Sequence, residues 1–333
     1  MQLAISFGGY YASVEKYVRA SENCERNQGI HSIWLADSQM IHRDVYECLA
    51  LCAMKTSRVK FGTAVTNPLT RDVTVTACAI STLDEISNGR AILGIGPGDS
   101  SVRRIGRNPA TVSQLENSVL EIRRTCRGEE LQSPNGEKVS MRWSSRDVPI
   151  YISATGPRML ELAGRVGDGV IMNVGTGELA LKKALASVRK GQQERKGFVT
   201  ADLSFVSLAE DRKAAIEAAR PYVVWYLKNA KHLFKENELD TKDLENSEVE
   251  SKYIEHDHIH TDSWSSASTR SKFITDELVD KFAIAGNPED CLRKLKEKER
   301  AGVDLFIARH TGDEKEWESF LKLYLETVVK QYK

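Results

Sequence analysis

The chain has 333 residues, of which 41% are hydrophobic and 28% charged, and its 47 basic and 47 acidic side chains give a formal net charge of +0. This balance is typical of a soluble globular protein and excludes the basic surface that binding to nucleic acid or an anionic membrane requires. The start, MQLAISFGGYYASVEKYVRA, lacks the signal-peptide pattern, and no apolar stretch reaches the ~20 residues of a membrane span. We therefore expect a cytoplasmic protein without a membrane or nucleic-acid partner.

Short β-type runs alternate with amphipathic helical segments along the chain. The runs expected as strands are 3–7, 32–36, 59–65, 91–96, 149–154, 169–174, 203–208 and 303–308. The helical segments between them include 12–28, 44–56, 72–87, 111–127, 157–167, 178–195 and 211–227. About eight strand–helix units predict an α/β fold of the (β/α)8 TIM barrel type. A doubly wound sheet is the alternative, but it usually has fewer strands and a GxGxxG turn, which SFGGYYAS does not supply.

Two segments interrupt the alternation within what we expect to be a single domain, residues 1–333. Residues 128–148 contain an Asn-Gly turn between β-like runs, which predicts an inserted hairpin before the fifth barrel strand. Residues 230–275 are strongly polar, and a long polar insertion in a barrel is typically a lid or a disordered loop.

The tract EHDHIH, residues 255–260, lies within this polar insertion. His256, His258 and His260 could share one face of a strand and bind zinc. No cysteine is nearby, so the sequence favours a polar surface loop over substrate or lid contacts, and we predict no metal site.

In a barrel, the functional residues follow the carboxyl ends of the strands. These positions supply only two carboxylates, Asp37 and Asp99, and they contain no lysine, HExxH or Ser/His/Asp arrangement. They do contain glycines at 96, 98 and 156, which permit close approach of a ligand to the backbone. A binding surface with few acids and bases suggests that a cofactor carries out the reaction and the protein supplies its shape.

The turn after the fifth predicted strand has the features of an anion site. Ser153 and Thr155 precede a helix that opens with Pro157 and Arg158. Backbone N–H groups, the helix dipole and the guanidinium would act together on a phosphate there. A plain helix N-terminus with a surface arginine is the alternative.

Three stretches, in this order, resemble the luciferase-like flavin and deazaflavin oxidoreductases, most closely the methylenetetrahydromethanopterin reductase branch, and the resemblance as a whole extends over most of the chain. They are WLADSQMIHRDVYECLALCAMKTSRVKFGTAVTNPLTRDVTVTACAISTLDEISNGRAILGIGPGDSSV, VPIYISATGPRMLELAGRVGDGVIMNVG and DELVDKFAIAGNPEDCLRKLKEKERAGVD. The resemblance implies a (β/α)8 barrel with a lid, a homodimer, and FMN or coenzyme F-420 bound at the strand ends.

The same resemblance implies positions for the cofactor. Asp37 and Ser38 would lie near its ring, and a non-prolyl cis peptide between Ala64 and Val65 would support the ring from behind. The turn 96–99 would flank its tail, and the turn 153–158 would hold its phosphate. The cofactor-binding residues that we predict are Ser6, Ala64, Val65, Thr66, Asn67, Gly96, Pro97, Gly98, Asp99, Ser153, Ala154, Thr155, Gly156, Pro157, Arg158 and Asn173.

The turn after the fourth strand bears on the choice of cofactor. Many FMN-binding relatives carry an arginine in this turn, whereas this chain has Pro97, as the deazaflavin-dependent reductases do. This difference favours F-420. Arg103, Arg104 and Arg107 follow closely and keep FMN as the alternative, unless they form a solvated basic face.

The residues after the first two strands bear on the reaction. The pterin reductases carry a glutamate where this chain has Ser6 and a histidine where it has Ser38, which argues against that specific activity. We predict hydride transfer between F-420 and a small or pterin-like organic substrate. An FMN-dependent monooxygenase and a non-catalytic cofactor-binding barrel are the alternatives. The catalytic residues predicted to tune or deliver protons are Asp37, Ser38, Gln39 and His42.

Overall fold

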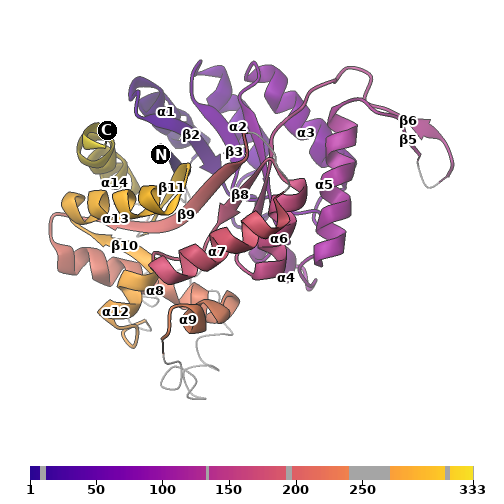
Figure 1. Ribbon diagram of the computed structural model, residues 1–333. Helices are drawn as coiled ribbons and strands as arrows, with labels where there is room; N and C mark the ends of the chain where they lie inside the picture. The colour runs from indigo at the N-terminus through magenta and orange to yellow at the C-terminus, as the bar shows by residue number, and fades with distance from the viewer. Residues whose placement is uncertain (8–12, 133–134, 193–196, 240–270, 312–315, 333) are drawn as a thin grey trace.

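Eight parallel strands form a closed barrel, surrounded by helices (Figure 1). The computed structural model describes residues 1–7, 13–132, 135–192, 197–239, 271–311 and 316–332. Pairing of β8 with β9 and of β1 with β11 closes the barrel, which confirms the (β/α)8 prediction over the doubly wound sheet. In chain order the barrel strands are β1 (Gln2–Phe7), β2 (Ile30–Leu35), β3 (Lys60–Thr63), β4 (Ala91–Ile95), β7 (Ile150–Ala154), β8 (Gly169–Met172), β9 (Val199–Leu208) and β11 (Leu305–His310).

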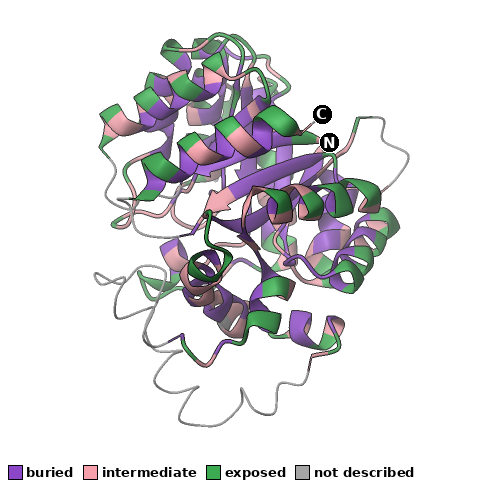
Figure 2. Ribbon diagram, turned by 90° about the vertical axis from the view of Figure 1, so that its left-hand side faces the viewer, coloured by how far each residue is buried: buried purple, intermediate pink, exposed green. Residues whose placement is uncertain are grey.

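Helices cover the outside of the barrel, so that the strands are buried and the outer helix faces are exposed (Figure 2). The longer helices are α1 (Val14–Arg26), α2 (Val45–Met54), α3 (Val73–Ile86), α5 (Val112–Cys126), α6 (Pro157–Val166), α7 (Glu178–Gly191), α8 (Arg212–Asn229) and α13 (Pro288–Ala301). The shorter ones are α4 (Ser100–Arg103), α9 (His232–Glu236), α12 (Asp276–Phe282), α14 (Trp317–Leu323) and the π-helical turn η3 (Tyr324–Val329). No helix in the described part of the chain is both long and apolar enough to span a membrane.

Capping residues in the sequence determine where several helices begin. The side chains of Asp44, Asp72 and Asn287 accept hydrogen bonds from backbone N–H groups at the starts of α2, α3 and α13. These bonds satisfy donors that have no partner within the helix. At the other end of α13, Gly302 adopts a φ of 100°, a left-handed conformation that favours glycine.

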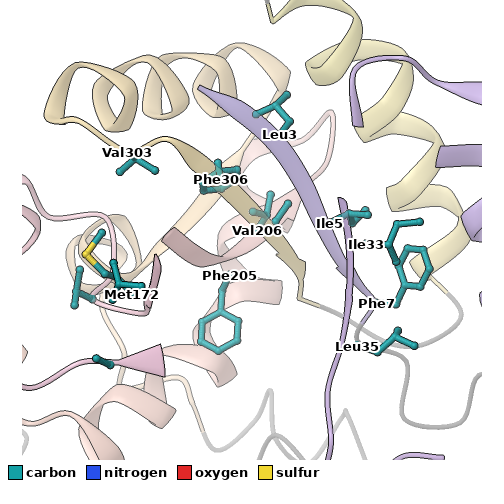
Figure 3. Close-up of a cluster of buried hydrophobic side chains, with 14 of the residues drawn as sticks. Leu3, Ile5, Phe7, Ile33, Leu35, Met172, Phe205, Val206, Val303 and Phe306 are labelled. Atoms are coloured by element: carbon teal, nitrogen blue, oxygen red, sulfur yellow. The ribbon is translucent and has the colours of Figure 1, made fainter. Parts of the chain in front are cut away.

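The strands bury both of their faces because successive side chains point to opposite sides. One set fills the barrel interior: Ala4, Trp34, Ala64, Ile92, Tyr151, Ile171, Ala201, Leu203, Leu305 and Ile307. A larger set forms the main hydrophobic core, part of which Figure 3 shows around β1, β2, β9 and β11. With both faces of the strands packed, space for a ligand is left mainly where the strands end.

Several strand boundaries differ from the prediction, and one strand was not predicted. β3 ends at Thr63 rather than at residue 65, and β9 begins at Val199 rather than at residue 203. The extra strand β10 (Ala283–Gly286) was not predicted, and it pairs with Phe205–Leu208 at the end of β9. Its sequence AIAG is too short and uniform to show a two-residue alternation, so only its partner strand reveals it.

Within residues 128–148, β5 (Leu131–Gln132) and β6 (Lys138–Val139) pair antiparallel at the tip of a projecting loop (Figure 1). Of the segment 230–275 expected as a lid, only 230–239 and 271–275 belong to the described residues, and α9 lies in the first of these parts. The EHDHIH tract lies outside the described residues.

Close packing of β3 on β4 leaves no space for a side chain at Gly94. Thr63 Oγ1 donates to the Gly94 carbonyl at 2.6 Å, and an added Cβ would lie 1.9 Å from the Thr63 carbonyl oxygen. We expect Gly94→Ala to lower the free energy of unfolding by about 3 kcal/mol, because backbone would have to move. Urea denaturation measures this change.

The matched control is Gly156→Ala, since Gly156 has a φ of −89° and no atom within 4 Å of an added Cβ. This variant should unfold within about 0.5 kcal/mol of the wild type. Equal stability of the two variants would contradict the packing argument.

Candidate active site

A cavity of about 370 Å³ opens at the carboxyl ends of the barrel strands. Its position agrees with the site expected for this fold. Many of the predicted site residues line it: Asp37, Ser38, His42, Ala64, Val65, Pro97, Gly98, Asp99, Ser153, Ala154, Thr155, Gly156 and Asn173. The remaining predicted residues are not among its described lining residues: Ser6, Gln39, Thr66, Asn67, Gly96, Pro157 and Arg158.

The wall formed after β3 consists of small and branched apolar residues. The peptide bond between Ala64 and Val65 is cis, as the family resemblance implied. The Ala64 N–H donates to the Leu35 carbonyl, and the Thr66 N–H donates to the Gly94 carbonyl. These bonds anchor the bulged segment to the strands on both sides of it.

The Asp37 carboxylate, at the end of β2, is buried and already has partners. Thr66 Oγ1 donates to Asp37 Oδ2 at 2.7 Å, and Arg71 Nη2 lies 3.4 Å from Asp37 Oδ1. Arg71 also forms an ion pair with Asp44 at 2.7 Å and lies over the Tyr46 ring. Asp37 and Thr66 therefore shape the cavity through this network, and Asp37 is not a free acid at its surface.

Burial of Asp44 opposes its ionisation, but the hydrogen bond and charge of Arg71, with two backbone N–H donors, lower the pKa of the Asp44 carboxyl overall. Asp44 also caps α2. The start of α2 is thus joined to the loop before α3 through a charged hydrogen bond.

Side chains after β2 hold the short helix α4 in place. Ser38 Oγ lies 3.0 Å from Ser100 Oγ, and Gln39 Nε2 donates to the Ser101 carbonyl at 2.7 Å. Asn67 Nδ2 donates to Ser101 Oγ from the loop after β3. The structure therefore gives Gln39 and Asn67 supporting positions behind the cavity, while Ser38 lines it.

His42 is half-buried and lines the cavity. Burial, and then the positive charge of Arg309, lower the pKa of His42 to about 3. The imidazole is consequently neutral at physiological pH, and it presents a hydrogen-bonding group without a charge.

The turn after β4 is fixed by Asp99. Its Oδ1 pairs with Arg103 Nε at 3.0 Å, and its Oδ2 accepts from Trp225 Nε1 at 3.2 Å. Gly98 has a φ of 88°, and an added Cβ there would lie 2.3 Å from the Val102 side chain. Only glycine suits that position, which brings backbone to the cavity.

Of the three arginines that follow this turn, Arg103 alone lines the cavity among the described residues. Arg104 is exposed. Arg107 is also exposed and donates to the Leu69 carbonyl at 2.8 Å.

The N-terminus of α6 faces the cavity without a side-chain cap. Gly156 is the N-cap residue, Pro157 occupies the first turn, and the helix start has no side-chain cap hydrogen bond within the described part of the chain. His232 Nε2 lies 3.1 Å from the Thr155 carbonyl oxygen, which accepts its hydrogen bond. Arg158 is exposed and is not among the described lining residues, whereas Thr155 and Gly156 line the cavity.

Another part of the cavity wall contains residues that were not among the predicted site residues, although Arg309 directly follows the last predicted strand. Phe205 from β9, Trp225 and Asn229 from α8 and Arg309 from β11 line the cavity. The position of Arg309, two residues after the inward-facing Ile307, could have indicated that its side chain points into the barrel mouth. No comparable sequence pattern indicates that residues of α8 line the cavity, because the tertiary fold brings this helix there.

Comparison with known proteins agrees with this geometry. The sequence model described as luciferase-like monooxygenase matches residues 6–305. The chain belongs to the luciferase-like monooxygenase family. Its relatives include the 5,10-methylenetetrahydromethanopterin reductase of Archaeoglobus fulgidus, 33% identical over 90% of this chain and 89% of that one. The reductase of the same name from Methanolobus tindarius is 32% identical over 84% of this chain and 86% of that one.

Solved structures of this family share the fold. The coenzyme F-420-dependent tetrahydromethanopterin reductase from Methanopyrus kandleri superposes with a TM-score of 0.80 at 23% identity, covering 100% of this chain and 99% of that one. An FMN complex of the type II Baeyer–Villiger 3,6-diketocamphane monooxygenase from Pseudomonas putida gives 0.65 at 16% identity, covering 99% and 98%. At these identities the structures establish the barrel and not its ligand.

The bridge formed by Arg71 is testable by substitution. Arg71→Met leaves Asp37 buried without its counter-charge, and we expect the free energy of unfolding near neutral pH to fall by about 2–3 kcal/mol. Because the pKa of Asp44 is lower in the folded protein than in the unfolded chain, its ionisation stabilises the fold at pH values above the unfolded-state pKa of about 3.9. This stabilisation is lost as the pH falls through the pKa of the folded state. The difference between the two proteins in urea denaturation should therefore narrow below about pH 4.

Arg71→Lys is the matched variant, because it keeps the charge and loses the planar fork. It should recover part of the lost stability. Wild-type stability of Arg71→Met near neutral pH would contradict the role of the bridge.

The neutral state of His42 predicts a pH dependence. Because its folded pKa lies near 3 and the unfolded value near 6.5, the unfolded chain binds a proton that the folded protein does not bind between these values. Stability is thus lost as the pH falls from about 6.5, and His42→Gln should reduce that loss. Urea denaturation at several pH values measures it.

His31→Gln provides the comparison, since burial first, and then the charges of Lys60 and Arg58, lower the pKa of His31 to about 4. Each single variant should be less pH-dependent than the wild type, and the double variant least. An unchanged pH dependence in His42→Gln would show that His42 titrates normally.

Proposed function

We propose that this protein is an oxidoreductase that binds coenzyme F-420 in the cavity and transfers hydride between it and a small or pterin-like organic substrate. The observation that carries the proposal is the N-terminus of α6, which has no side-chain cap and faces the cavity beside the small residues Ser153 and Ala154. The names of the relatives from Archaeoglobus fulgidus and Methanolobus tindarius support a reductase, and the name of the Methanopyrus kandleri structure supports the cofactor.

The residues present fit such a cofactor. Backbone N–H groups at Gly156 and the start of α6 would hold its phosphate, where open space surrounds the glycine. Ala64 and Val65 would support the ring, and Gly98 would allow the tail to approach the backbone. When bound, the deazaflavin supplies the hydride chemistry that the side chains lack.

The chain's own polar groups would orient the substrate and handle protons. Ser38 and the neutral His42 both line the cavity and can donate or accept hydrogen bonds. Asp37 would act indirectly, because Thr66 and Arg71 already occupy its oxygens. Ser6 stands where the pterin reductases are expected to carry a glutamate, and β1 contains no acidic residue. Ser6 itself is buried and is not among the described lining residues.

The assembly that we propose is a cytoplasmic homodimer, as the family resemblance implies. The alternative activity is that of an FMN-dependent monooxygenase, which is favoured by Arg103 in the cavity lining and by the FMN-bound structure of the same fold. A non-catalytic cofactor-binding barrel is the alternative of another class.

The test of the proposal is cofactor binding, measured by calorimetry with F-420 and with FMN separately. We expect F-420 to bind more tightly than FMN. Gly156→Val should weaken F-420 binding by at least about tenfold without loss of stability, because the added group fills ligand space and contacts no protein atom at its Cβ.

Tight binding of FMN with no affinity for F-420 would overturn the proposal in favour of the monooxygenase. Binding of F-420 without turnover of any hydride donor or acceptor would favour the non-catalytic barrel. Gly156→Ala is the control for backbone effects, since it adds only a methyl group.

A further inference from the structure

Arg309 projects into the mouth of the barrel from the end of β11. Leu305 and Ile307 on the same strand belong to the interior cluster, so the two-residue alternation brings Arg309 to the same face one step further along. Its neighbours in register are Ser6 on β1 and Phe205 on β9. Arg309 is half-buried, and its side chain lines the cavity.

Among the charged residues of the described cavity lining, Arg309 is the one without an ion-pair partner. The other charged lining residues are Asp37, Asp99 and Arg103. Asp99 pairs with Arg103, and Asp37 pairs with Arg71 from outside the cavity. Within the described residues, the structure gives the Arg309 side chain no ion pair or hydrogen bond, only a contact with the face of the Phe205 ring, whose centroid lies 5.6 Å from the guanidinium carbon.

A cation–π contact orients a guanidinium without neutralising it. Phe205 in turn packs edge-on against Trp225, with ring centroids 6.4 Å apart. Leu203 extends this apolar surface into the barrel. The half-buried guanidinium of Arg309 thus lies beside an aromatic and aliphatic wall.

This position is separate from the proposed phosphate site. The uncapped helix α6 follows β7, whereas Arg309 ends β11, and β8 and β9 lie between these two strands in the barrel. One cofactor phosphate therefore does not account for both features. A single uncompensated positive charge matches a monoanion better than a dianionic phosphate ester.

We propose that Arg309 is a specificity-determining residue that binds a carboxylate of the substrate. The inference rests on the proposed function only in taking the ligand at Arg309 to be the hydride partner. The planar guanidinium can donate two parallel hydrogen bonds to a carboxylate, while the Phe205 wall receives the apolar body of the same molecule. The favoured substrates are organic acids with an unsaturated or carbonyl group near the carboxylate.

The experiment uses benzoate as the probe and benzamide as its neutral counterpart. Calorimetry measures the binding of both to the full-length protein, first alone and then saturated with F-420. We expect benzoate to bind more tightly than benzamide, and Arg309→Met to weaken benzoate by at least about tenfold with little effect on benzamide. Arg309→Lys should recover part of the affinity.

Arg104→Met is the control, because it removes the same charge from an exposed position outside the described lining. It should leave benzoate binding unchanged. Affinity for F-420 should stay within about twofold in Arg309→Met, which also shows that the variant is folded.

Three results would overturn the inference. They are equal affinity of the wild type for benzoate and benzamide, unchanged benzoate affinity in Arg309→Met, and a loss of F-420 affinity as large as that of benzoate. The third would assign Arg309 to the cofactor. Failure of F-420 to bind the wild type counts against the proposed function alone, since the benzoate measurements without cofactor still decide the role of Arg309.

Discussion

The position of the cavity-lining residue Asp37 depends on one guanidinium, that of Arg71, which Asp37 shares with Asp44. Asp37 follows β2, Asp44 begins α2, and Arg71 reaches both from the loop before α3. Without the shared cation, two neighbouring carboxylates would lose solvent and repel each other. With it, the end of β2 is fixed relative to β3, and Thr66 completes the arrangement. Asp37, which the sequence indicates as a candidate catalytic carboxylate, therefore supports the structure of the neighbouring groups.

Close packing limits the size of the residues that can form the cavity wall after β3 and β4. Gly94 meets the Thr63 carbonyl, Gly98 meets Val102, and an added Cβ at Gly96 would lie 3.2 Å from both Val65 and Ser153. These positions leave little room for side chains, and of the three glycines Gly98 is among the described residues that line the cavity. Their lack of reactive groups follows from packing, which is why the chemistry is expected from a bound cofactor.

The sequence predicted the barrel and the part of the cavity lining that follows β2, β3, β4, β7 and β8. Alternating strands and helices located all eight barrel strands, and the convergence of their carboxyl ends located Ser38 and Thr155 at one cavity, where the family resemblance also placed Ala64. Gln39 and Thr66 were predicted at the same site, but their polar groups bond to Ser101 and Asp37, partners that are distant in sequence. Hydrogen-bond partners of this kind follow from the fold and not from spacing along the chain.

The rest of the cavity lining was harder to predict for a different reason. Trp225 lies on a helix whose apolar residues are distributed around it, and only its bond to Asp99 shows which side faces the cavity. The strand β10 was missed because four small apolar residues show no alternation. Its pairing with the end of β9 extends that strand past Phe205 and so shapes this wall.

The distribution of charge around the mouth limits the chemistry that the site can support. Ser6 leaves the end of β1 without an acid, the Asp37 carboxylate after β2 is already bonded to Thr66 and Arg71, and His42 is a neutral imidazole at physiological pH. These groups can orient a substrate, but none of them is a strong proton donor. A fixed cation can instead hold a carboxylate of the substrate, as proposed for Arg309, the cation without a carboxylate partner among the described lining residues. A substrate that accepts hydride next to a carboxylate is better suited to this cavity than one whose ring nitrogen must be protonated at once.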